Sequence, residues 1–313
     1  MKVLVTGATG FVGYAVAAAL SAADHEVIAL TRATRPLPGG VRRLAGDLVD
    51  AASVGQALTS ERLDAVCHLA ALARVRDSRA DPLGYWRTNV GGTLALMGAL
   101  AAQDEPARLV AASTCAVYGE DVPQPITEAQ VPTPTNPYGS TKLAADRAIA
   151  DVAATGAIGA ISLRAFNIAG GVGTHADPDT SRLIPKIVAV ARGEAPELTV
   201  NGDGSVVRDY LHVVDMADAF VRALDACEPG TWKAYNVGSG NRSTIADVIA
   251  AAEEVIGRPL PVKHNPPADE PKVLLADPSL ARKELGWRPQ RSDLRQIVRD
   301  AYDAVTSRDS ASE

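Results

Sequence analysis

Short apolar runs alternate with longer segments of helical periodicity along the first half of the chain. The apolar runs occupy residues 2–7, 26–31, 64–71, 107–114 and 159–167. Helical segments lie near 11–22, near 84–103 and from residue 136 onward. Strands that are apolar along their whole length, separated by helices, are typical of a parallel sheet covered on both faces. The pattern therefore predicts an α/β fold with a doubly wound parallel sheet.

This alternation ends after residue 168, where the glycine-rich stretch AGGVGTHADPDT leads into shorter elements and a proline-rich joint at 258–271. Glycine and proline in such density mark loops and joints between domains. We expect a dinucleotide-binding domain at 1–168, to which the chain returns around 207–238. A second, smaller α/β substrate-binding domain is expected from 169–206 and 239–308, followed by a frayed tail at 309–313.

Composition narrows the class of protein. The chain has 313 residues, 47% of them hydrophobic, which is enough to fill a sizeable core. A formal net charge of −6 without an arginine-rich run argues against nucleic acid as a partner. Cys67, Cys115 and Cys227 are widely separated, so they indicate neither a disulfide frame nor a metal site and favour a reducing cytoplasm. No apolar run approaches the roughly 20 residues that cross a bilayer, and the first glycine comes too early for a signal peptide, so no membrane partner is expected.

A glycine-rich turn, TGATGFVG (6–13), follows the first strand and opens a helix. Gly7 permits the tight turn, Gly10 lets a pyrophosphate approach backbone N–H groups, and Gly13 permits close packing of the helix on the sheet. The N-terminus of that helix then faces two negative phosphates. This strand–turn–helix context favours a Rossmann dinucleotide site over a merely tight turn.

The segment NPYGSTK (136–142) places a tyrosine and a lysine four residues apart. Asn136 suits a helix cap and Pro137 the first helical position, so Tyr138 should lie at a defined helix start. Lys142 then lies one turn further along the same face. The spacing alone is equally that of a partly buried tyrosine beside a solvated lysine, so the remaining motifs have to decide between the two.

The end of the second strand bears on the choice of cofactor. Sites specific for NAD usually carry an acidic residue there, which accepts both ribose hydroxyls and repels a 2′-phosphate. The segment VIALTRATR has Thr31 at that place and Arg32 beside it, which by itself favours NADP. Arg32 could instead lie over the adenine or point to solvent. Asp47, after the third strand, is a candidate contact for the adenine amine or an ordinary turn carboxylate.

Ordered motifs extend over nearly the whole chain: TGATGFVG, HLAAL (68–72), NVGGT (89–93), STCAVYG (113–119), NPYGSTK, RAFN (164–167), VRDYLHVVDMADA (207–219), NVGSG (236–240) and ARKELGW (281–287). Together they resemble the extended short-chain dehydrogenase/reductase family, and within it the nucleotide-sugar 4-epimerases of the UDP-glucose 4-epimerase type. The resemblance implies that Tyr138 is the catalytic base, that Lys142 is its partner and holds the nicotinamide ribose, and that Thr114 completes the catalytic set.

The resemblance also implies residues for the two ligands. The cofactor set is Gly7, Gly10, Phe11, Val12, Gly13, Arg32, Asp47, Leu48, Leu69, Ala70, Ala71, Asn89, Tyr138 and Lys142. The substrate set is Thr114, Phe166, Asn167, Leu183, Arg208, Tyr210 and Glu270. In this set Phe166 and Asn167 flank the sugar diphosphate, Leu183 lies near the uracil, and Arg208 binds phosphate through its planar fork. An ion pair with Asp209 or another surface carboxylate is the alternative for Arg208. His68 and His212 are expected to be structural, and no metal is expected.

The chemistry explains why a tyrosine and a lysine are needed together. Oxidising a sugar alcohol requires a base that removes the hydroxyl proton while hydride leaves the same carbon. A phenol titrates near 10, and lowering that pKa to about 7 requires roughly 4 kcal/mol of preference for the phenolate. Lys142 and the positive nicotinamide can supply it. Thr114, at the carboxyl end of a strand, is expected to orient the same substrate oxygen.

Departures from the family pattern narrow the reaction. Dehydratases of the family carry an Asp-Glu pair directly after the threonine, and decarboxylating relatives keep an acid there, whereas this chain has Cys115 and Ala116. Pro267 stands where a second phosphate-binding arginine is usual. Leu274 falls where a larger tyrosine is common, which leaves room for a bulkier sugar.

These inferences lead to an NAD-dependent nucleotide-sugar 4-epimerase that inverts C4 of a UDP-hexose through a 4-keto intermediate. Bound NAD is expected, with weak discrimination against NADP because of Thr31 and Arg32. One alternative is an NAD(P)H-dependent reductase of a 4-keto sugar nucleotide, and another is a dinucleotide-binding sensor without catalysis. The resemblance also implies a homodimer formed through a two-helix face.

Overall fold

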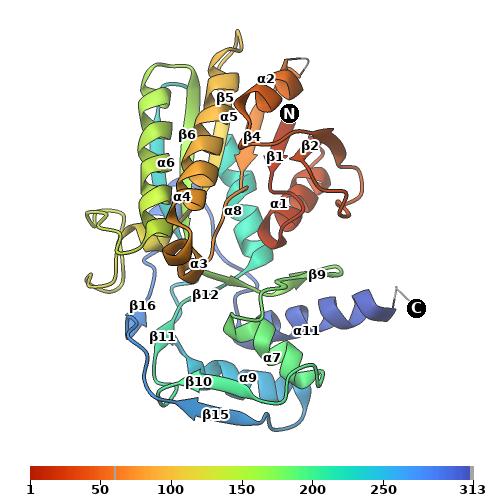
Figure 1. The fold of residues 1–313 in the computed structure, drawn as a ribbon, viewed down its shortest axis with the longest axis vertical. Helices are drawn as coiled ribbons and strands as arrows, with labels where there is room; N and C mark the ends of the chain where they lie inside the picture. The colour runs from red at the N-terminus through yellow and green to blue at the C-terminus, as the bar shows by residue number, and fades with distance from the viewer. Residues whose placement is uncertain (60, 311–313) are drawn as a thin grey trace.

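A seven-stranded parallel sheet forms the centre of the computed structural model, which describes residues 1–59 and 61–310 (Figure 1). The strand order is β13-β6-β5-β4-β1-β2-β3. The strands are β1 (Lys2–Thr6), β2 (Glu26–Thr31), β3 (Arg42–Ala45), β4 (Ala65–His68), β5 (Ala107–Thr114), β6 (Ile158–Ala165) and β13 (Trp232–Val237). The predicted doubly wound fold is confirmed.

Helices cover both faces of this sheet, whose central strands β1, β4, β5 and β6 are buried along almost their whole length. One apolar cluster joins the sheet to α1 (Phe11–Ala22) and α8 (Val213–Ala226). A second cluster joins the opposite face to α2 (Ala51–Leu58), α5 (Gly92–Ala101) and α6 (Pro137–Ala154). The helix predicted at 11–22 begins and ends where the pattern placed it.

The helix predicted near 84–103 differs from a single regular helix. The chain forms α3 (Val75–Ala80), α4 (Pro82–Tyr85), a π-helix η1 (Trp86–Gly91) and then α5. Asn89 inside the π-helix is buried and bonds through its side chain to two other segments of the chain. Such wide turns occur where a residue is displaced toward a functional site.

A third apolar cluster is built mainly from the second half of the chain, around α7 (Leu183–Ala191), α9 (Ile245–Ile256) and α11 (Leu294–Ser310). Small sheets accompany it in the lower part of Figure 1. Their strands are β7 (Asn167–Ala169), β8 (Gly171–Val172), β9 (His175–Ala176), β10 (Leu198–Asn201), β11 (Val207–Arg208), β12 (Tyr210–His212), β14 (Ser243–Thr244), β15 (Val262–Asn265) and β16 (Val273–Leu274). A short helix, α10 (Ser279–Glu284), precedes α11.

The C-terminal helix is longer than the sequence indicated. Helix α11 continues to Ser310, so the predicted frayed tail does not begin at 309. Residues 311–313 of that tail lie outside the described residues. Across the part of the chain that the structure describes, no helix combines the length and the apolar character needed to cross a membrane.

Candidate active site

Helix α6 begins where its sequence indicates. The Asn136 Oδ1 accepts a hydrogen bond of 2.9 Å from the Gly139 amide, and Pro137 occupies the first turn. A Cβ at Gly139 would lie 2.4 Å from the carbonyl oxygen of Ala116, so glycine is what lets the helix press against the turn after β5. That turn follows Thr114, and the contact therefore brings Thr114 and Tyr138 together.

The Thr114 side chain lies close enough to the Tyr138 phenol to lower its pKa, and the Tyr138 ring meets the ring of Tyr85 edge-on, with centroids 6.4 Å apart. Burial nevertheless raises the pKa of Tyr138 to about 12, although Thr114 and the positive charge of Arg182 act in the opposite direction. Lowering that pKa from 12 to 7 takes roughly 7 kcal/mol of preference for the phenolate. The protein alone therefore holds the proposed base in its neutral form.

Lys142 is only 7% exposed and lies one turn from Tyr138 on the same face of α6. Burial lowers the pKa of Lys142 to about 8, while the charge of Asp146 raises it. The expectation that Lys142 and the nicotinamide together lower the pKa of the phenol stays a prediction; in the protein, burial has the largest effect on the pKa of both Tyr138 and Lys142.

The glycine turn has the shape of an anion cradle. Gly7 has a φ of +75°, and a Cβ there would lie 2.8 Å from the amide nitrogen of Ala70. A Cβ at Gly13 would lie 2.1 Å from the carbonyl oxygen of Gly7, so the helix packs on the turn without a side chain between them. Gly10 caps α1 without a side-chain hydrogen bond, which leaves the first amides of α1 available to phosphate. These features fit a dinucleotide.

His68 connects the end of β1, next to the glycine turn, to α5. Its Nδ1 lies 2.8 Å from the Thr6 hydroxyl and its Nε2 lies 3.0 Å from the Thr93 hydroxyl. Burial and the charge of Lys142 lower the pKa of His68 to about 3, so the ring is neutral. The Thr6 hydroxyl accepts bonds from the amides of Leu69 and Ala70, both 3.1 Å long. His68 therefore has a structural role, as expected.

Apart from Asn89, the remaining residues of the predicted cofactor set lie just after the ends of strands in the central sheet or at the start of α1. Phe11 and Val12 open α1, Leu48 follows β3 and Ala71 follows β4, and all four are partly buried. Asn89 is committed to the protein: its Oδ1 accepts from the Leu72 amide, and its Nδ2 donates to the Thr141 hydroxyl at 3.0 Å. Asn89 thus ties the segment after β4 to α6.

Arg32 and Asp47, predicted separately, lie together. The Arg32 Nη1 and the Asp47 Oδ2 are 3.2 Å apart, with side-chain exposures of 72% and 36%. Thr31 ends β2, and its hydroxyl accepts a bond from the Ala33 amide. The cation beside the expected adenosine ribose is therefore partly neutralised by a neighbouring carboxylate.

The substrate set lies at the junction with the second half of the chain. Phe166 and Tyr210 are buried, Leu183 opens α7, and the Asn167 amide group donates to the Asp209 carbonyl at 3.0 Å. Arg208 donates to the Pro271 carbonyl at 2.8 Å and pairs with Glu270. Of the alternatives considered for Arg208, its partner here is Glu270 rather than Asp209.

Asp209 does not pair with Arg208 but binds the segment after β13. Its buried carboxylate accepts bonds from the hydroxyl and amide of Ser239, both 2.7 Å long, and from the Gly240 amide. Leu274 on β16 is the strand partner of Arg208 on β11, so their backbones lie side by side. Pro267 lies near Gly202.

The second histidine in the motifs is also structural. His212 accepts a bond from the Val214 amide through Nδ1, and its Nε2 lies 3.1 Å from the Asp300 carboxylate. Burial lowers the pKa of His212. No group of three or more potential metal ligands exists among the residues that the structure describes.

Four residues at the site were not predicted from the sequence: Tyr85, Asp146, Arg164 and Arg182. Arg182 is held by Asp177 at 2.9 Å, close enough to Tyr138 for its charge to affect the phenol. Asp146 and Arg164 form a buried ion pair of 3.3 Å behind Lys142. The position of Asp146, one turn after Lys142, was a usable signal, whereas Tyr85 and Arg182 approach Tyr138 only through the fold.

A Rossmann sheet, a glycine cradle and a Thr–Tyr–Lys set define an enzyme of the dinucleotide-dependent α/β class. The family model that matches residues 3–238 is the NAD dependent epimerase/dehydratase family, and the chain belongs to that family. The expected family resemblance is confirmed.

Individual relatives agree with this assignment. The chain is 39% identical to a UDP-glucose 4-epimerase of Corynebacterium glutamicum, covering 98% of this chain and 96% of the relative. A structure of a UDP-glucose-4-epimerase from Stenotrophomonas maltophila with bound NAD and formylated UDP-arabinopyranose superposes with a TM-score of 0.92, at 32% identity and 99% coverage of both chains. The epimerase from Bifidobacterium longum in complex with NAD+ and UDP gives a TM-score of 0.89, at 30% identity and 98% coverage of both chains. These findings support a nucleotide-sugar 4-epimerase over the reductase and the sensor.

Proposed function

We propose that this enzyme inverts C4 of a UDP-hexose, interconverting UDP-glucose and UDP-galactose or a related pair, through a 4-keto intermediate. The observation that carries the proposal is the meeting of Thr114, Tyr138 and Lys142 beside the glycine cradle. The names of the relatives supply the nucleotide and the carbon that reacts.

The residues of the catalytic set take distinct roles in this proposal. Tyr138 removes the proton of the C4 hydroxyl and later returns one to the oxygen of the opposite epimer. Thr114 donates to that oxygen and orients it, and Lys142 contributes positive charge and holds the nicotinamide ribose. Bound NAD supplies the acceptor and donor for hydride. Since the cofactor is restored in every cycle, tight retention suits the reaction.

Two guanidinium groups anchor the nucleotide in this proposal. Arg208 binds the diphosphate, oriented by the Pro271 carbonyl and Glu270. Arg182, held by Asp177, is the second cation of the site and takes the part that Pro267 leaves vacant. Phe166, Asn167, Leu183 and Tyr210 complete the predicted substrate set.

NAD is the proposed resident cofactor, with weak discrimination against NADP. Support for NAD comes from the relatives whose structures hold it. Support for weak discrimination comes from Thr31, which cannot repel a 2′-phosphate, and from Arg32, which can attract one. The ion pair between Arg32 and Asp47 favours NAD because it occupies the cation.

The assembly and the organisation of the chain complete the proposal. Leu83, Trp86 and Leu94 are 72%, 42% and 50% exposed along α4, η1 and α5, which supports a homodimer through this helical face. Three free, buried cysteines suit a reducing cytoplasm. We assign the dinucleotide to residues 1–168 with 207–238, and the nucleotide sugar to 169–206 with 239–308. No nucleic acid or membrane partner is proposed.

The test is incubation of purified protein with UDP-glucose or UDP-galactose without added cofactor. Interconversion of the two sugars is the expected result. Stoichiometric consumption of NADPH with a 4-keto sugar nucleotide would indicate the reductase instead. Inactivity across a panel of nucleotide sugars, with NAD bound, would indicate the sensor.

A further inference from the structure

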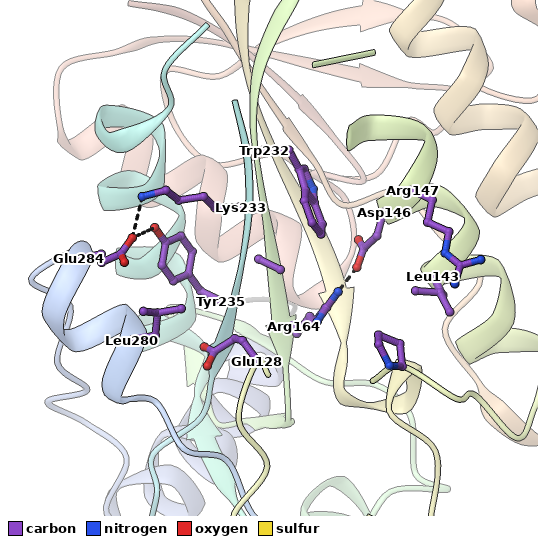
Figure 2. Close-up of a pocket in the computed structure, with 12 residues that line it drawn as sticks. Glu128, Leu143, Asp146, Arg147, Arg164, Trp232, Lys233, Tyr235, Leu280 and Glu284 are labelled. Carbon is purple, nitrogen blue, oxygen red and sulfur yellow. Dashed lines mark hydrogen bonds and ion pairs between the residues drawn. The ribbon is translucent and has the colours of Figure 1, made fainter. Parts of the chain in front are cut away.

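A buried carboxylate lies directly behind the catalytic lysine. Asp146 is 2% exposed and lies one helical turn after Lys142 on α6. Its Oδ2 accepts hydrogen bonds from the Ser113 hydroxyl at 3.1 Å and from the Arg164 Nε at 3.3 Å. Figure 2 shows this ion pair joining α6 to the strand that carries Arg164. Since Ser113 directly precedes Thr114, Asp146 links α6, which carries Tyr138 and Lys142, to the end of β5, which carries Thr114.

The partner of Asp146 is itself held in place. The Arg164 Nη1 donates to the Tyr118 hydroxyl at 3.0 Å, and the guanidinium carbon lies 5.1 Å from the centre of the Tyr118 ring. Tyr118 in turn donates to Asn236 Oδ1 at 2.8 Å. Because Arg164 is fixed by these contacts, its charge and position are constant while Lys142 changes protonation state.

A pocket of about 570 Å³ lies next to this ion pair and β13 (Figure 2). Asp146 and Arg164 line it together with Glu128, Trp232 and Tyr235.

Lys142 has few charged groups around it. Tyr138 and Asp146 face it from its own helix, neutral His68 faces it from β4, and Arg164 lies behind Asp146 on β6. Asp146 is the carboxylate that favours the charged lysine against the cost of burial. Without it, two buried cations would share the region with no counter-charge between them.

We propose that Asp146 is a positioning residue for catalysis, which keeps Lys142 protonated next to Tyr138 at the pH where the enzyme works. The ion pair with Arg164 holds the carboxylate in place for this task, and Ser113 adds a further hydrogen bond to it. The inference deepens the proposed function and rests on it for the role of Lys142.

The sign of the effect follows from the charge. Asp146→Asn keeps the size and a hydrogen-bonding oxygen but removes the negative charge, so the pKa of Lys142 falls below its value of about 8. Activity that needs charged Lys142 is then lost at lower pH. Removing a unit charge one turn away moves the alkaline limb of kcat/KM down by about one to two pH units.

The experiment compares pH profiles of kcat/KM for NAD-loaded wild type, Asp146→Asn, Asp146→Glu and Ser113→Ala. We expect Asp146→Asn to be about five-fold or more below wild type at pH 8 and to recover as the pH falls. Asp146→Glu keeps the negative charge, so the alkaline limb of its kcat/KM profile should lie close to that of wild type. Ser113→Ala removes a bond to the same carboxylate but no charge, and should leave the limb in place.

Equal loss of activity by Asp146→Asn at every pH would show a structural role only and overturn the proposal. Lysine labelled with 13C at Cε gives a readout that needs neither turnover nor a folded variant of Asp146. Its NMR titration follows Lys142 in the wild-type holoenzyme, with the signal assigned by its absence in Lys142→Met. A neutral Lys142 below pH 7 would also overturn the proposal. Failure of the proposed function is seen separately, as a wild type that holds NAD and does not interconvert the sugars.

Discussion

Replacing Tyr138 by phenylalanine removes one oxygen and tests the proposed base directly. The ring keeps its edge-on contact with Tyr85, at 6.4 Å between centroids, so we expect the fold to remain intact. Loss of general-base catalysis lowers turnover by about 10² to 10⁴, equivalent to roughly 3 to 5.5 kcal/mol in the barrier.

Chromatographic assay of UDP-glucose and UDP-galactose, without added cofactor, measures the effect on turnover. Melting temperature and the NAD content of the denatured protein report whether fold and cofactor are retained. Tyr85→Phe is the matched control, because it removes the same atom from the neighbouring ring, where the hydroxyl donates to the Arg74 carbonyl at 2.6 Å. Turnover of Tyr138→Phe close to that of wild type, with NAD bound, would exclude Tyr138 as the base.

Three further predictions address the ligands and the assembly. Arg208→Ala should weaken UDP binding, measured by calorimetry, by about ten-fold or more. Glu270→Gln keeps the guanidinium and should bind UDP at least as well as wild type. Unchanged affinity in Arg208→Ala would refute the role of Arg208. Asp47→Asn frees Arg32 and should raise the share of NADP in the dinucleotide released on denaturation, measured by mass spectrometry, and predominantly NADP from the wild type would contradict the assignment of NAD. Leu94→Glu places a charge on the exposed face of α5, so it should yield a monomer in analytical ultracentrifugation where the wild type forms the proposed dimer; a monomeric wild type would rule this prediction out.

The elements predicted best are those specified by local chemistry. Strands 26–31 and 107–114 and the helix at 11–22 coincide with the structure because apolar runs and glycine turns mark their ends. The start of α6 was equally readable, since Asn136 and Pro137 are local signals. The glycine cradle could also be predicted from local sequence, because its glycines directly follow a strand and open a helix.

Features that depend on distant parts of the chain could not be predicted in this way. The π-helix at 86–91 follows from the burial of Asn89 between Leu72 and Thr141. The partner of Arg208 is 62 residues away in sequence, and nothing local distinguishes Glu270 from other carboxylates. The effect of burial on the pKa of Tyr138 was not readable from the sequence either, because the extent of that burial depends on the whole fold.

The electrostatics of the catalytic pair link the fold to the proposed reaction. Burial keeps Tyr138 neutral and lowers the pKa of Lys142 to about 8, so Lys142 is still mostly charged at neutral pH, with Asp146 favouring that charge. A neutral phenol avoids the desolvation cost of a buried phenolate. In the proposed mechanism, the positive charge of the cofactor favours the phenolate and Asp146 favours the charged lysine. Ionisation of the proposed base would then be coupled to cofactor binding, as expected of an enzyme that retains its cofactor throughout the cycle.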